Sequence, residues 1–140
     1  MVRRAPRVGN APRLPPDRHR SESSGVTCDN LGGMTADNVI VTTTTDSEST
    51  AQELAAAAIR ARLGACAQLI GPITSVFRWE GEVQTEQEWR VEVKAPADCE
   101  ESLIAQLQQH HNYDVPEIIT TPITGGNPAY LTWLSDETRQ

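Results

Sequence analysis

Residues 65–94 constrain the fold most, because they read as two long β-strands joined by a tight turn. Apolar and polar side chains alternate over residues 73–79 and again over about 83–94, as in strands with two different faces. Trp79-Glu80-Gly81-Glu82 is the hairpin turn between them, and Gly71-Pro72 marks a bend or bulge in the first strand. A hairpin this long overshoots any helix packed beside it, so it needs another sheet or another subunit as a partner.

Helical patterns flank this hairpin, and a further strand stands outside each of them. In chain order we expect a strand at 39–45, a helix from Asp46 or Ser47 to about Leu63, the hairpin, a helix after Pro96, a strand at 117–123 and a short helix at 129–135. Gly64 stands where a C′ glycine belongs, and Asp98 with Glu101 resembles a capping box.

This order of elements predicts an α+β fold. Two right-handed β-α-β crossovers around a hairpin give a β-α-β-β-α-β chain, with a four-stranded antiparallel sheet and both helices on one face. No helix remains for the other face, although its strands carry Trp and Phe. Oligomerisation is the simplest cover for that face.

Residues 1–36 have almost no apolar periodicity and are interrupted by four prolines. We therefore predict a disordered N-terminal tail over 1–36 and a single domain over 37–140. The tail can be untranslated sequence ahead of a true start codon at Met34, an organelle transit peptide or a functional extension. The sequence leaves these three interpretations open.

Charge and composition exclude several classes of partner. The first 33 residues carry a net charge of +3 and the remainder −10, so the folded part would repel a nucleic-acid backbone. No run of about 18 apolar residues is present, so no membrane span is expected. The three cysteines, at positions 28, 66 and 99, lack zinc-site spacing, and a reducing compartment is expected.

Catalysis is not expected either. The sequence has no nucleophile elbow, P-loop or dinucleotide-binding motif, and no serine or cysteine stands in a context that indicates activation. We therefore predict that the protein is not an enzyme.

The main polar irregularity is His110-His111, at the end of the second helix. Imidazole is a common metal ligand, but adjacent histidines cannot easily chelate one ion from the same helix face, so a third group would be needed. Alternatively, the two histidines, when protonated, interact favourably with the helix dipole in the last turn of the helix. The run Thr42 to Thr45 can line a polar pocket, although an exposed strand leading to a helix cap is the commoner arrangement.

Several segments in the right order resemble the CutA family, the divalent-cation tolerance proteins. They cover about residues 39–135 and are Ala51-Gln-Glu-Leu-Ala, Arg62-Leu-Gly-Ala-Cys-Ala, Thr74-Ser-Val-Phe-Arg-Trp-Glu-Gly, His111-Asn-Tyr-Asp-Val-Pro-Glu-Ile and Gly126-Asn-Pro-Ala-Tyr-Leu-Thr-Trp-Leu. The resemblance implies a ferredoxin-like fold in a tight homotrimer, a cytoplasmic location, and a link to copper and other divalent ions.

The resemblance also implies a copper site. Its ligands would be His110, His111 and, in some relatives, a cysteine whose position is taken here by Thr43. A threonine hydroxyl is a poor copper ligand beside a thiolate, so the substitution leaves a His-based site of lower affinity. The family motif commonly has proline where this chain has Asn112, which changes backbone stiffness before Tyr113.

Two functions follow as expectations. The first is a non-enzymatic, homotrimeric divalent-cation (copper) tolerance protein, which requires no cofactor and binds Cu(II) or another divalent metal. The second is a trimeric signalling or small-ligand module that resembles PII-type regulators. The candidate cleft-lining residues for the second function are Thr43, Trp79, Lys94, Tyr113 and Glu117.

Overall fold

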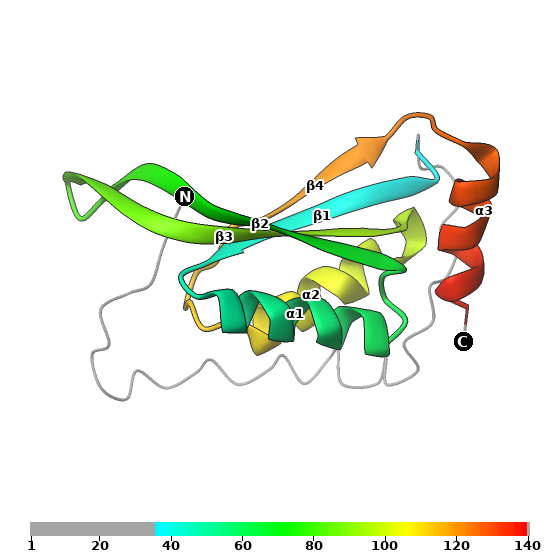
Figure 1. Ribbon diagram of the computed structural model, residues 1–140, viewed down its shortest axis with the longest axis horizontal. Helices are drawn as coiled ribbons and strands as arrows, with labels where there is room; N and C mark the ends of the chain where they lie inside the picture. The colour runs from blue at the N-terminus through cyan, green and yellow to red at the C-terminus, as the bar shows by residue number, and fades with distance from the viewer. Residues whose placement is uncertain (1–35, 140) are drawn as a thin grey trace.

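A computed structural model describes residues 36–139, so the predicted tail lies outside the described residues apart from Ala36. The elements are β1 Asn38–Thr45, α1 Glu48–Arg60, β2 Cys66–Trp79, β3 Glu82–Pro96, the 3-10 turn η2 Ala97–Cys99, α2 Glu100–His110, β4 Ile118–Ile123 and α3 Pro128–Glu137. The strands form one antiparallel sheet in the order β2-β3-β1-β4. Figure 1 shows α1 and α2 side by side against one face. The α+β prediction is confirmed.

The core lies between the sheet and these two helices. Strand residues of one parity, such as Val41 on β1 and Val91 and Val93 on β3, are fully buried. Helix α1 contributes Leu54 and three buried alanines, as its three-to-four spacing predicts. Its N-cap is Ser47, whose Oγ accepts a hydrogen bond from the Thr50 N–H at 3.0 Å.

The end of α1 differs from the prediction. Its C-cap is Ala61, and Arg62 adopts the left-handed conformation, with φ of 57°. The Arg62 N–H donates to the Ile59 carbonyl and the Leu63 N–H to the Ala58 carbonyl, which is a Schellman motif. Gly64 is therefore not the C′ residue. It is required because a Cβ at position 64 would overlap Val93 Cγ1 on β3.

The start of the second helix differs as well. Residues 97–99 form the 3-10 turn, and α2 begins after Cys99 without a side-chain cap. Asp98 lies inside this turn and not at the cap position of α2. The expected capping box is therefore wrong, although the position of the helix is correct.

The β2–β3 hairpin extends well beyond the helices (Figure 1) and is called the arm here, residues 73–88. Register shifts between Ile70 and Ile73, which confirms the predicted irregularity at Gly71-Pro72. Glu80 and Gly81 at the tip have φ of 50° and 78°, as a type I′ turn requires. None of the helices in the described part is long and apolar enough to cross a membrane.

Candidate functional site

The threonine run at the end of β1 is buried and not exposed. Thr43, Thr44 and Thr45 are each at most 2% exposed. Their hydroxyls donate in turn to the Glu117 carbonyl at 2.7 Å, the Glu117 Oε2 at 3.1 Å and the Asn112 Oδ1 at 2.8 Å. The expectation of an exposed strand is therefore wrong, because the segment between α2 and β4 folds over this end of the strand and uses every hydroxyl.

His111 lies at the centre of this contact, and both of its ring nitrogens are engaged. Its Nδ1 accepts from the Tyr113 N–H at 3.0 Å. Its Nε2 lies 3.0 Å from the Thr44 carbonyl oxygen and 3.1 Å from Thr43 Oγ1. A carbonyl only accepts, so Nε2 carries the proton and the imidazole is neutral.

Burial lowers the pKa of His111 below its usual 6.5. The Thr44 carbonyl and the Asp46 carboxylate favour the charged form, but the loss of hydration outweighs both. The neutral ring is therefore the form that this environment favours near neutral pH.

Asn112 fastens the same segment to the residues after β1. Its Oδ1 accepts from the Thr45 hydroxyl, and its Nδ2 donates to Asp46 Oδ1 at 2.8 Å. A proline at this position would make neither bond, so Asn112 does more than change backbone stiffness. No sequence pattern pointed to these contacts, because their partners are 66 and 67 residues away.

Tyr113 carries the contact across to β3. Its hydroxyl donates to Glu88 Oε2 at 3.0 Å, and Glu88 is fully buried. The Tyr113 ring also lies 4.9 Å from the His111 ring, centroid to centroid. The sequence singled out Tyr113 but not Glu88, because Glu88 falls among polar residues that alternate with the core positions of β3.

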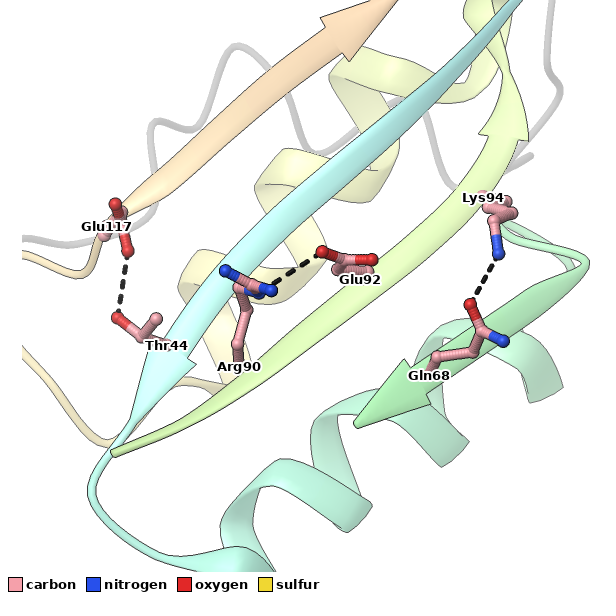
Figure 2. Close-up of polar contacts among 6 residues, drawn as sticks. All are labelled: Thr44, Gln68, Arg90, Glu92, Lys94 and Glu117. Atoms are coloured by element: carbon pink, nitrogen blue, oxygen red, sulfur yellow. Dashed lines mark hydrogen bonds and ion pairs between the residues drawn. The ribbon is translucent and has the colours of Figure 1, made fainter. Parts of the chain in front are cut away.

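The remaining candidate residues do not join this cluster. Figure 2 shows Thr44 with Glu117 at one end of the open sheet face and Lys94 with Gln68 at the other. Lys94 Nζ donates to Gln68 Oε1 at 2.6 Å, and Arg90 and Glu92 form an ion pair of 3.2 Å between the two ends. Trp79 is the last residue of β2, at the tip of the arm.

The predicted cleft residues thus lie at three separate places in one chain. Thr43, Tyr113 and Glu117 come together, whereas Lys94 and Trp79 lie elsewhere on the sheet and on the arm. A cleft that contained all five residues would have to form between subunits.

The two histidines also differ from each other. His110 is exposed in the last turn of α2, whereas His111 is 8% exposed and fully hydrogen-bonded. Within residues 36–139 no three His, Cys, Asp or Glu side chains lie close enough together to hold a metal ion. These residues do not fit a resident copper centre built on the histidine pair.

Comparison with known proteins identifies the family. Residues 39–137 match the model described as CutA1 divalent ion tolerance protein. The divalent-cation tolerance protein CutA of Escherichia coli O139:H28 is 38% identical over 102 residues, which are 73% of this chain and 91% of that protein.

Solved structures agree with this match. The CutA1 structure from Oryza sativa superposes with a TM-score of 0.72 at 36% identity, over 75% of this chain and 96% of its own. CutA1 from Ehrlichia chaffeensis gives a TM-score of 0.72 at 29% identity, over 76% and 100%. The resemblance carried by the sequence segments is confirmed: this chain belongs to the CutA1 family of divalent ion tolerance proteins.

Proposed function

We propose that this protein acts in divalent-cation tolerance as a homotrimer, without catalysing a reaction. It binds Cu(II) weakly through His110. His110 and His111, which the sequence offered together as metal ligands, therefore have different roles. Metal contact is assigned to the exposed ring alone.

The proposed metal contact rests on the different environments of the His110 and His111 rings. Both nitrogens of His111 are used by Tyr113 and Thr44 inside the fold. His110 is exposed at the end of α2, where an ion can reach it from solvent. A single imidazole without a preformed ligand set supports weak binding, and Thr43 adds no soft ligand.

The hydrogen-bonding pattern also supports a non-enzymatic role. A catalytic hydroxyl needs a neighbouring base that can take its proton. Here the Thr43 hydroxyl donates to a backbone carbonyl, and the His111 nitrogen that could act as a base accepts from a backbone N–H. These groups stabilise the end of the sheet and leave no nucleophile with its base.

The arm supports assembly into a homotrimer. Val76 and Val83 are each 64% exposed and lie diagonally on one face of the arm, beyond both helices. Exposed β-branched side chains on an extended ribbon favour contact with another protein surface. Ile119 on β4 is 50% exposed and lies on the sheet face opposite the helices. A symmetric oligomer would cover the arm and the open face together.

Calorimetric titration of the full chain with Cu(II) tests the metal contact. We expect weak, saturable binding in the wild type and in Gln109→Ala, a matched variant of an exposed neighbour on α2. Binding should be lost in His110→Ala, because the exposed ring is removed while the fold is unchanged. Binding that survives His110→Ala at the wild-type affinity would overturn this assignment.

A further inference from the structure

We infer that His111 is a positioning residue and not a metal ligand: it closes a hydrogen-bonded lock that fixes Tyr113 on Glu88 at the base of the arm. The lock consists of His111, Asn112 and Tyr113, the three residues that follow α2. The inference is independent of the metal contact proposed for His110.

The lock joins three consecutive residues to two strands. His111 and Asn112 bond to the last three residues of β1, and Tyr113 bonds to β3 through its hydroxyl. His111 and Tyr113 are at most 8% exposed. Within the lock, the bond from the Tyr113 N–H to His111 Nδ1 fixes the backbone that aims the tyrosine ring.

Metal binding would break this arrangement at either nitrogen. A metal on Nδ1 takes the lone pair that accepts the Tyr113 N–H, so this buried hydrogen bond is lost. A metal on Nε2 displaces the proton shared with the Thr44 carbonyl. If that proton moved to Nδ1, it would face the Tyr113 N–H, so two donors would meet. Neither nitrogen is therefore available while the lock is closed.

The position of Glu88 gives the lock its role. Glu88 pairs with Ile73, the first pair beyond the register shift, where the arm leaves the main sheet. Its carboxylate is fully buried and accepts the Tyr113 hydroxyl. The lock therefore ties the base of the arm to the end of β1, so it fixes the direction in which the arm projects.

The protonation state of His111 provides the first test. In a ¹⁵N–¹H long-range correlation spectrum of the full chain we expect His111 with a proton on Nε2 and none on Nδ1. Addition of Zn(II), a diamagnetic probe, should leave both nitrogen signals unchanged. Loss of the Nε2 proton or a zinc-dependent shift of either nitrogen would overturn the inference. A spectrum in which His110 also fails to respond would leave the lock intact, and the Cu(II) titration of His110→Ala then decides the proposed metal contact separately.

Amide exchange provides the second test, with a conservative rescue. His111→Asn places an amide oxygen where it can accept the same N–H two residues later, as in an Asx turn. We expect the Tyr113 amide to exchange about tenfold faster, or more, in His111→Ala than in the wild type, with protection largely restored in His111→Asn. His110→Ala is the matched control and should exchange like the wild type. If His111→Ala is too unstable to study, the exchange rate of the Tyr113 amide is compared between two other variants. We expect protection of this amide in His111→Asn and faster exchange in Asn112→Ala. Wild-type exchange at Tyr113 in His111→Ala, or no protection in His111→Asn, would overturn the inference.

Discussion

At the residue scale, the two adjacent histidines have different chemistry because only one of them is buried. The His111 ring accepts and donates inside the fold, whereas the His110 ring meets solvent. From sequence position alone, both histidines are equally plausible metal ligands. Burial and the direction of each lone pair decide which of them an ion can reach.

The neutral state of His111 makes stability depend on pH. Its pKa is lowered in the folded protein by burial, so below about pH 6.5 the unfolded chain binds a proton that the folded chain does not. We expect the free energy of unfolding to be unaffected by this group above pH 6.5. It should fall as the pH drops from 6.5 toward the lowered pKa, by at most about 1.4 kcal/mol per pH unit.

Urea unfolding of the wild type and of His111→Asn between pH 5 and 8, at one protein concentration, checks this dependence. The slope that belongs to His111 should be absent from the variant. An identical slope in both proteins would assign the pH dependence to other groups.

Asn112 offers a second prediction at this scale. Asn112→Ala removes the acceptor of the fully buried Thr45 hydroxyl and the donor to Asp46. An unsatisfied buried hydroxyl costs about 1–3 kcal/mol, so we expect a loss of stability in that range. Denaturant unfolding measures the loss, with Gln109→Ala as a control that should stay near the wild type. A change of less than a few tenths of a kcal/mol would contradict the contribution assigned to these bonds.

At the element scale, the close approach of α1 to the sheet depends on Gly64. A methyl group there would overlap Val93 Cγ1, and Val93 is fully buried. Overpacking of this kind costs about 1–3 kcal/mol, so Gly64→Ala should destabilise the fold by that amount. Gly125→Ala is the matched control, since nothing lies within 4 Å of its added methyl group. Thermal unfolding of the two variants compares them, and equal midpoints would contradict the packing argument.

The elements could be predicted from the sequence because their patterns are local. Apolar spacing located α1, alternation located β2 and β3, and Glu80-Gly81 marked the turn between them. The predicted end of α1 was wrong because glycine is the usual residue in the left-handed conformation at a helix end. Here Arg62 adopts that conformation, and Gly64 allows close packing against β3.

The candidate site could be predicted only in part, because it depends on contacts across the chain. Thr43, His111, Tyr113 and Glu117 were singled out, and they do come together. The pairing of Tyr113 with Glu88 was missed, because alternation along β3 places Glu88 with exposed polar residues. A periodic pattern describes one strand and does not include a side chain that arrives from 25 residues away.

At the scale of the whole molecule, one chain leaves parts of its surface incomplete. The arm projects beyond the helices, and α1 and α2 both lie against the same face of the sheet (Figure 1). Arg90 and Glu92 form an ion pair on the face opposite α1 and α2, and the apolar Ile70 lies directly across from Arg90 on β2. A surface of this kind suits a partner that is itself another copy of the chain. The proposed role rests on this assembly.

Light scattering coupled to size-exclusion chromatography tests the assembly most directly. We expect the full-length wild type to show three times the mass of one chain. The double variant Val76→Lys, Val83→Lys should dissociate, because it replaces two exposed apolar side chains on one face of the arm with charged ones. Gln109→Ala should remain assembled as the control. A wild-type protein with the mass of a single chain at micromolar concentration would contradict the homotrimer, and with it the role proposed for the arm.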